Sequence, residues 1–277
     1  GLVFTTAVWG STFVVVKGAI STIPVLDFLA LRFALAFVVM VAVRPRALAS
    51  LGRSGWRHGV VLGVVLAGGY AAQTFGLVTA SASVSGFITG LFVVFTPLIG
   101  AVLLRRRVAG VVWAAVVVAT VGLGLISLHG LAVGRGELLT VGGAMFFALH
   151  IVGLGEWSHR SDAYALAVVQ IGTVAAVSLG LALASDRAHV MVLPSGASGW
   201  GAVGITALLG TAAGFFLQTW SQARMPATRA AVVLTMEPVF AGITGVLSGE
   251  SLAARGWVGA ALVLAAMYLV EVAPRRG

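Results

Sequence analysis

Long apolar runs, each closed by a short gap of turn residues or charges, make up most of this chain. A helix needs about 20 mostly apolar residues to cross the hydrocarbon core of a bilayer. Runs of this length predict membrane-spanning helices joined by short loops. The pattern therefore predicts an all-α polytopic membrane protein of about ten transmembrane helices. The candidate spans lie near residues 2–20, 25–43, 59–79, 82–104, 109–127, 138–157, 163–184, 199–222, 229–248 and 256–272.

The composition excludes a water-soluble domain and a disordered chain. Of the 277 residues, 60% are hydrophobic and 9% are charged, and the mean hydropathy is +1.08. Soluble domains carry about 25% charged residues, and disordered chains have low hydrophobicity. The chain has no cysteine, which excludes disulfides, thiolate chemistry and cysteine metal sites.

Membrane topology accounts for the basic charge. A net charge of +9 would indicate nucleic-acid binding in a soluble protein, but most basic residues here stand in gaps between apolar runs. With a cytoplasmic N-terminus, twelve arginines fall on the cytoplasmic side and three on the other, as the positive-inside rule requires. We therefore expect a multi-pass protein of the inner or plasma membrane, with both termini cytoplasmic, the lipid bilayer as a partner and no nucleic-acid partner. The twelve are Arg44, Arg46, Arg53, Arg57, Arg105, Arg106, Arg107, Arg160, Arg224, Arg229, Arg275 and Arg276, and the three are Arg135, Arg187 and Arg255. Because Gly1 already lies inside an apolar run, we expect the natural N-terminus to lie upstream.

An internal repeat emerges at a nearly constant spacing. Polar or helix-breaking residues of the first half recur in the same order 138 to 145 positions later. The repeat divides the chain into residues 1–130 and 131–277, with five spans in each unit. An odd number of spans forces the second unit to lie upside down, and inverted repeats are a signature of secondary transporters with a central substrate site. The matched pairs are Arg32 and Gln170, Gln73 and Gln218, Ala82 and Ala227, Ser83 and Thr228, and Pro97 and Pro238.

Several short motifs, in this order along the chain, resemble the drug/metabolite transporter superfamily, EamA type. They are Trp9-Gly10-Ser11-Thr12-Phe13, Arg32-Phe33, Gln73-Thr74, the stretch 79–87, Glu237-Pro238-Val239-Phe240-Ala241 and Gly249-Glu250. The resemblance implies a bundle of two inverted five-helix repeats around a substrate pathway. It also implies transport of amino acids, other metabolites, sugars or drugs, often by export. Where first repeats of this family often carry a Gly-Glu pair, this chain has Arg105-Arg106-Arg107.

Glu237, Pro238 and Pro97 are the candidates for coupling and gating. A carboxyl group inside a membrane span is costly and needs a reason, and Pro238 should kink or open the helix beside it. Glu237 is a candidate proton carrier. Alternatively, it forms hydrogen bonds with the backbone groups freed by the helix break, or it pairs with a cation. Pro97 matches Pro238 in the first unit, and Thr96 before it can bond a backbone carbonyl. The pair of prolines forms either a hinge for alternating access or two static bends.

The polar and aromatic residues inside the spans are the candidates for substrate binding. Arg32 suits a substrate carboxylate, or it pairs with Glu237 or Asp27, or it caps a helix end. Lys17 is expected to reach the outer interface. His150 either titrates or is hydrogen-bonded within the bundle. The other amides and aromatics suit either a cavity wall or interhelical contacts. The candidate binding residues are Trp9, Arg32, Tyr70, Gln73, His150, Phe215, Gln218 and Gln222.

The absence of other motifs narrows the function. No metal-ligand pattern, phosphate loop or paired catalytic group is found in the sequence, so we expect no catalytic residues, metal or cofactor. The sequence favours a secondary transporter of small organic solutes by alternating access, exporting amino acids or related metabolites, with protons as a candidate coupling ion. The alternatives are an efflux transporter for drugs or organic cations, an intramembrane enzyme, and a scaffold without flux. A monomer and a homodimer both fit the sequence.

Overall fold

A computed structural model describes residues 1–105, 109–129, 132–185, 190–224, 230, 233–234 and 236–271. For residues 126–129, 132–133 and 270–271 only the backbone is described. The repeat positions Ala227 and Thr228 lie outside these ranges, and so do six of the arginines that predict topology. Those six are Arg106, Arg107, Arg187, Arg229, Arg275 and Arg276.

Helices account for nearly all of the described chain. The first half contains α1 (Leu2–Ala19), α2 (Val25–Val43), η1 (Leu48–Ser50), α3 (Arg53–Thr79), α4 (Ala82–Thr89), α5 (Phe92–Leu104) and α6 (Gly110–Ser127). Two short antiparallel strands, β1 (Leu128–His129) and β2 (Ala132–Val133), join α6 to the second half. The second half contains α7 (Arg135–Trp157), η2 (Ser158–Arg160), α8 (Ala163–Ser185), α9 (Gly196–Ile205), η3 (Thr206–Ala213), α10 (Gly214–Gln222), α12 (Met236–Leu247) and α13 (Ala254–Glu271).

Small polar residues fix several helix ends. The Ser81 hydroxyl accepts the Val84 N–H (3.2 Å) at the start of α4. An Asp162 carboxylate oxygen accepts the Ala165 N–H (2.8 Å) at the start of α8. Such caps satisfy N–H groups that have no partner within the helix. After α12, Gly249 adopts φ 90°, which favours glycine, and the turn presents Glu250 to the bundle.

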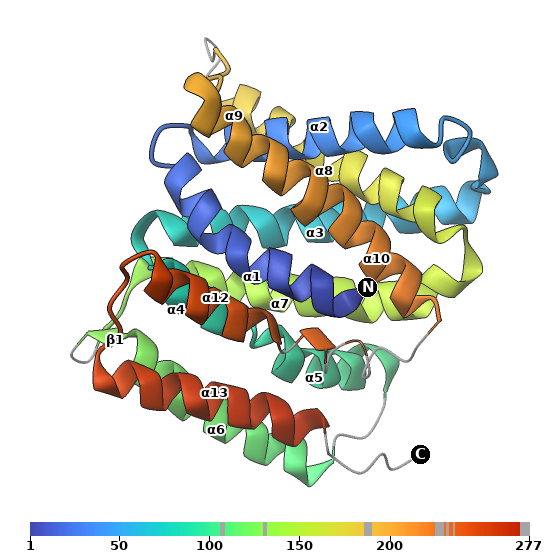
Figure 1. Ribbon diagram of the computed structural model, residues 1–277. Coiled ribbons are helices and arrows are strands. Elements are labelled where there is room, and N and C mark those ends of the chain that lie inside the picture. The colour runs from blue at the N-terminus through green and yellow to red at the C-terminus, as the bar shows by residue number, and fades with distance from the viewer. Residues whose placement is uncertain are drawn as a thin grey trace.

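The helices form one bundle in which successive long helices run in opposite directions (Figure 1). In this view α2, α8 and α9 lie at the top, and α6 and α13 lie at the bottom. The beginning of α1 and the end of α13 lie at the same end of the bundle, which we call the terminal end; the other is the distal end.

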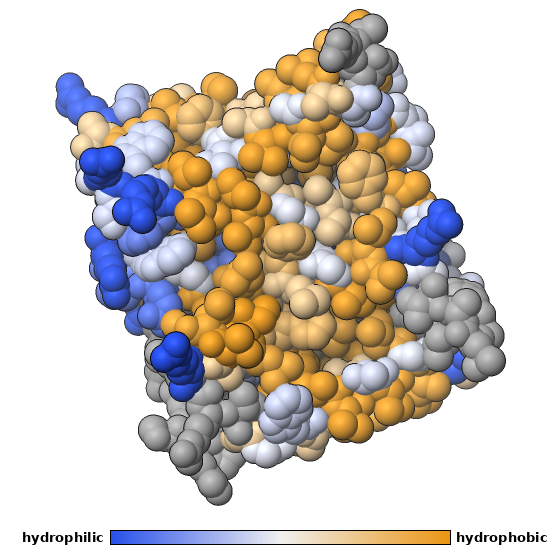
Figure 2. Space-filling model, turned by 180° about the vertical axis from the view of Figure 1, so that it is seen from behind, coloured by the Kyte–Doolittle hydropathy of each residue, from blue (hydrophilic) through white to orange (hydrophobic). Residues whose placement is uncertain are grey.

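The described chain has seven helices that are long and apolar enough to cross a membrane by length and composition. Three shorter apolar helices are found at Gly110–Leu125, Met236–Leu247 and Ala254–Leu269. Figure 2 shows a broad apolar band over one face, with hydrophilic residues toward its two edges. These features are those of an integral membrane protein, because lipid-facing surfaces must be apolar. The count of ten spans stays a prediction.

Three predicted spans differ in detail from the structure. The span near 59–79 begins earlier, at Arg53. The span near 82–104 is divided at Gly90 and Leu91, where Leu91 N–H bonds the Ile88 carbonyl instead of a carbonyl four residues back. The span near 199–222 is interrupted by η3, a π-helical stretch in which the Thr211 hydroxyl also reaches back to the Thr206 carbonyl (2.9 Å). Hydropathy measures the length of an apolar run and does not reveal such breaks within the helix.

Most helices of one half of the chain pack against helices of the other half. In the first half, α3 packs on α7 and α8, and α1 packs on α12. In the second half, the segment from η3 to α10 packs on α1, η3 packs on α2, and α7 packs on α4 and α5. The pairs α2 with α8 and α6 with α13 each join matching helices of the two halves.

Glycines let α12 lie close to both α1 and α4. A Cβ atom at Gly10 would lie 2.5 Å from the Glu237 carbonyl oxygen, and one at Gly86 would collide with the Ala241 side chain. Small residues permit this approach of backbones in membrane helices. The contact places the beginning of α12, which carries Glu237 and Pro238, at the centre of the bundle.

Candidate functional site

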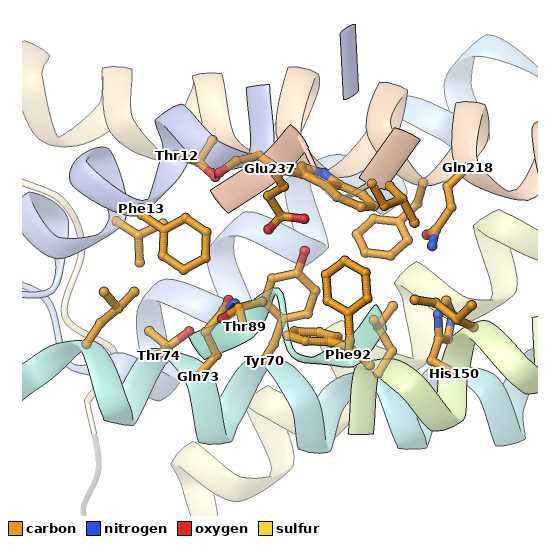
Figure 3. Close-up of a pocket in the computed structure, with 18 of the residues that line it drawn as sticks. Thr12, Phe13, Tyr70, Gln73, Thr74, Thr89, Phe92, His150, Gln218 and Glu237 are labelled. Atoms are coloured by element: carbon orange, nitrogen blue, oxygen red, sulfur yellow. Dashed lines mark hydrogen bonds between the residues drawn. The ribbon is translucent and has the colours of Figure 1, made fainter. Parts of the chain in front are cut away.

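A small cavity of about 50 Å³ lies between α1, α2, α3, α4, α5, α7, α10 and α12 (Figure 3). Known ligand pockets measure about 300–1,000 Å³, so this cavity must widen before it admits an organic solute. Its wall consists of Trp9, Thr12, Phe13, Val16, Arg32, Leu66, Tyr70, Gln73, Thr74, Leu77, Thr89, Phe92, Phe147, His150, Ile151, Phe215, Gln218, Leu234 and Glu237.

Arg32 is the cation of this cavity and is only 2% exposed. Its Nε donates to the Thr211 hydroxyl (2.8 Å). Its guanidinium carbon lies 4.9 Å from the Tyr70 ring centroid and 5.3 Å from the Phe33 ring centroid. Stacking on aromatic faces and one hydroxyl acceptor hold the planar group in place. The predicted alternative of an ion pair with Glu237 is wrong, because no nitrogen of Arg32 lies within 4 Å of that carboxylate.

Glu237 is the acid of the same cavity and is 5% exposed. It lies in the first turn of α12, with Pro238 after it. Proline is tolerated in the first turn of a helix, and a carboxylate there is stabilised by the helix dipole. Among the described residues, its carboxylate has no hydrogen-bond or ion-pair partner. The Tyr70 hydroxyl points toward it (Figure 3).

The π-helical stretch η3 and the following α10 position the aromatic residues of the cavity wall. Trp9 Nε1 donates to the Gly210 carbonyl (2.6 Å) in η3. A π-helical stretch leaves backbone carbonyls available for such bonds and is frequent at functional sites. The Trp9 ring lies 5.2 Å from the Phe215 ring, and Phe215 lies 5.9 Å from Tyr70, between centroids.

Two amides, which the predicted repeat pairs with each other, line the cavity from α3 and α10. Gln73 Nε2 donates to the Thr89 hydroxyl (2.9 Å). The Oε1 atom of Gln218 is buried and has no partner among the described residues. Buried polar groups without a partner are rare in proteins. This acceptor is therefore available to a bound solute or water.

His150 lines the cavity and is bonded within the bundle, because its Nε2 lies 2.6 Å from Gln170 Oε1. Gln170 Nε2 in turn donates to the Leu166 carbonyl (3.1 Å). These hydrogen bonds, which link His150 to α8, fix the imidazole ring. Figure 3 shows His150 and Gln218 together at one end of the cavity.

Seven of the eight candidate binding residues line this cavity, and Gln222 does not. Gln222 Nε2 donates to the Ile151 carbonyl (3.3 Å), so its amide joins α10 to α7. Pro97 and Pro238 also lie outside the wall. Next to Pro97, the Thr96 hydroxyl donates to the Phe92 carbonyl (2.6 Å), as the sequence suggested. The roles of all these residues in binding and gating stay predictions.

The wall also includes residues that the sequence argument missed. Phe147 lies one turn before His150 on α7, and that spacing was a usable signal. Thr89 and Phe92 flank the break between α4 and α5. Nothing in their local sequence distinguishes them from the other residues of an apolar span.

A polar clamp at the distal end of the bundle joins the turn after α12 to the start of α4. Glu250 Oε1 accepts the Ala82 N–H (2.7 Å), and Oε2 accepts the Ser83 N–H (2.9 Å). Although burial raises the pKa of Glu250, the bonds from Ser83 and Ala82 and the charge of Lys17 lower it below its ordinary 4.5. Lys17 Nζ donates to the Leu77 carbonyl (3.3 Å) and to the Ala80 carbonyl. Lysine side chains favour such carbonyls at a helix C-terminus, and the expectation that Lys17 reaches the membrane interface stays a prediction.

An ion pair joins α2 to α8 at the terminal end. Arg44 Nη1 lies 3.0 and 2.9 Å from the two carboxylate oxygens of Asp162. Burial raises the pKa of Asp162, but the Ala165 N–H and Arg44 outweigh this effect and lower the pKa below its ordinary 3.8. Tyr164 supports the arrangement, since its hydroxyl donates to the Met40 carbonyl (2.7 Å).

The bundle and its central polar cavity define an integral membrane protein with an internal site between its helices. The EamA-like transporter family matches the chain over residues 1–128 and 134–272. A protein of Archaeoglobus fulgidus, described as an uncharacterized transporter, is 29% identical over 98% of this chain and 85% of that protein. A crystal structure of another protein superposes with a TM-score of 0.71 at 17% identity, over 97% of this chain and 94% of the other, which bears on the fold alone. The chain belongs to the EamA-like transporter family and is a membrane transporter.

Proposed function

We propose that this protein is a secondary transporter of small zwitterionic metabolites, with amino acids as the leading class. One observation carries the proposal. Arg32 and Glu237 bring a basic and an acidic side chain to one buried cavity, and no ion pair joins them. Isolated charges in a membrane interior are costly. A solute with both a carboxylate and an ammonium group compensates both at once.

Alternating access is the proposed mechanism. The exchange of helix partners between the halves supports an inverted repeat, and secondary transporters with such repeats expose a central site to each side in turn. The volume of about 50 Å³ corresponds to a closed form, because it is too small for an organic solute. Loosening of the distal clamp and of the contacts at the terminal end would open the cavity to one side or the other. We propose export as the direction and protons as the coupling ion.

The aromatic wall supports a second candidate, an efflux transporter of organic cations. Aromatic faces attract cations, and Trp9, Tyr70 and Phe215 surround the cavity together with Glu237. The fixed positive charge of Arg32 opposes a solute that carries only positive charge. The zwitterion is therefore the better match to this charge pattern.

Solute counterflow in proteoliposomes tests both candidates and the scaffold alternative. The panel contains amino acids, sugars and quaternary ammonium ions. Saturable exchange of amino acids alone is the expected result. Exchange of quaternary ammonium ions alone would support the second candidate. No exchange by protein shown to be folded and inserted would reject the zwitterion proposal and leave a scaffold.

A further inference from the structure

A second cavity, separate from the central one, opens on the outer surface of the bundle between α2, α3 and α8. It measures about 420 Å³ and is lined by apolar residues of these helices and of η1. Phe37 of α2, Leu48 of η1 and Trp56 of α3 line it, together with residues of α8 from Val169 to Val177. We call this cavity the α8 groove.

The lining of the α8 groove suits an alkyl chain and not a polar solute. Its one polar side chain, Thr173, already donates its hydroxyl to the Val169 carbonyl (2.8 Å). From Val169 to Val177 the groove follows eight residues of α8, which is about 12 Å at 1.5 Å per residue. A Cβ atom at Gly172 would lie 2.8 Å from the Phe37 ring, so this glycine lets the ring lie against α8.

Positive charge gathers where the groove reaches the terminal end of the bundle. Arg53 precedes Trp56 by three residues on α3 and Arg57 by four, so the Arg53 side chain neighbours both of them on the helix surface. Arg46 stands two residues before Leu48, next to η1. All three arginines are exposed, and none forms an ion pair with an acid of the described chain.

The acids nearby do not neutralise this charge. Among the described side chains, Asp162 and Glu156 are the acids at the terminal end. Asp162 is bound by Arg44, and Glu156 has a partner of its own. The mouth of the groove therefore keeps an excess of positive charge.

We propose that the α8 groove is a binding site for an anionic phospholipid. One acyl chain lies along α8 between Phe37 and Trp56, and the phosphate faces Arg46, Arg53 and Arg57. Basic pockets between membrane helices recruit anionic headgroups, and tryptophan is favoured at the level of the headgroups. The site does not depend on which solute the central cavity transports.

Native mass spectrometry of the purified protein in detergent tests the site, with phosphatidylglycerol and phosphatidylcholine of the same acyl chains as probes. We expect the protein to retain at least about fivefold more phosphatidylglycerol, since one arginine near a headgroup favours an anionic lipid by roughly that factor. Arg53→Gln together with Arg57→Gln should lower the preference severalfold, to the level that Arg46 alone supports. Both side chains are exposed, so the packing of α3 on α8 stays intact.

A variant that fills the groove provides a second, charge-independent test. Ala176 lines the groove and is exposed, and Ala176→Phe should lower the retention of both lipids. The matched controls are Ala261→Phe on the exposed side of α13 and Arg224→Gln together with Arg135→Gln, which change exposed residues remote from the groove in the sequence. Equal retention of the two lipids, or equal losses in the controls, would overturn the proposal. A dimer that dissociates on Ala176→Phe would also overturn it, because the occupant would then be a second copy of the chain.

Discussion

Protein contacts fix the Arg32 side chain in place, but no acid of the described chain pairs with its charge. Thr211 fixes Nε, and Tyr70 and Phe33 cover the guanidinium plane. The rest of the group faces a small cavity whose acid lies beyond ion-pairing distance. A buried charge is costly unless a partner compensates it. Because this cavity holds little water, a bound ligand compensates the charge of Arg32 better than water does.

Replacing Arg32 should therefore weaken the recognition of carboxylates in particular. Hydrogen bonds to charged groups contribute about 1.5–3 kcal/mol, so we expect Arg32→Gln to raise the counterflow KM for an amino acid at least tenfold. The KM for the corresponding decarboxylated amine should rise much less. Arg32→Lys should be intermediate, because it keeps the charge but loses the planar fork. The exposed Arg224→Gln is the control, and an equal effect of Arg32→Gln on both solutes would argue against a carboxylate site.

Glu237→Gln separates proton coupling from substrate binding. Counterflow needs no net proton movement, whereas accumulation driven by a pH gradient does. If Glu237 carries the proton, the variant should retain counterflow and lose the accumulation. If it binds the ammonium group, both activities should fall about tenfold or more. The control is Glu137→Gln, which changes a buried acid outside the cavity. An unchanged response to the pH gradient would exclude Glu237 as the proton carrier.

At the scale of elements, polar contacts join helices at both ends of the bundle. At the distal end, the Glu250 clamp joins the turn after α12 to the start of α4. At the terminal end, Arg44 and Asp162 join α2 to α8. The two ties differ in kind, since Glu250 accepts backbone N–H groups and Asp162 combines a helix cap with an exposed ion pair.

Loss of the Glu250 clamp should open the distal end. Because the chain has no cysteine, Thr74→Cys places a single thiol in the cavity wall. We expect Glu250→Ala to raise its labelling rate by a water-soluble maleimide about tenfold, and Glu250→Gln to raise it less, since one amide oxygen still accepts a bond. With the maleimide present on the distal side alone, Asp162→Ala, at the other end, should not raise the rate. Equal rates with and without Glu250 would show that the clamp does not limit access.

The Asp162 tie predicts a graded and pH-dependent loss of stability. Asparagine caps helices about as well as aspartate, so Asp162→Asn should cost no more than about 1 kcal/mol, the ordinary range for an exposed pair. Asp162→Ala also loses the cap, worth about another 1 kcal/mol. Since the pKa of Asp162 is lowered in the folded protein, its charge-dependent contribution is present above 3.8 and is lost as the pH falls through the lowered value. Thermal unfolding in detergent should therefore show the wild type converging on Asp162→Asn at acidic pH. A difference that persists there would contradict the role of the charge.

For the whole molecule, the distribution of basic residues predicts the orientation. The described arginines that follow α2, α5 and α10 or begin α3 lie at the terminal end, and Arg135 and Arg255 begin helices at the distal end. From the positive-inside rule we therefore predict that the terminal end lies in the cytoplasm.

Two exposed serines allow this orientation to be tested. Ser54 follows the start of α3 at the terminal end, and Ser251 lies in the turn before α13 at the distal end. In intact cells, an impermeant maleimide should label the Ser251→Cys variant and should label the Ser54→Cys variant only after the membrane is permeabilised. The reverse pattern would show that the termini face outward.

The sequence by itself determined the approximate positions of the long helices and the family, because both depend on local patterns along the chain. Apolar length set the positions of the long helices within a few residues, because each span must satisfy its own backbone in lipid. The motifs around Trp9, Arg32, Gln73 and Glu237 indicated the family that the comparison confirmed. Each of these four residues also lies in the cavity wall.

Only the tertiary structure decided what those residues contact. The bond from Arg32 to Thr211 joins positions 179 residues apart, and Thr211 is presented by a π-helical stretch that hydropathy cannot reveal. Gln222 has the same periodicity as Gln218, yet it bonds the backbone of α7. Lys17 lies near the end of a predicted span, yet it caps α3. A sequence pattern fixes which face of a helix is polar, but the approach and crossing of other helices determine whether that face meets a cavity, a carbonyl or lipid.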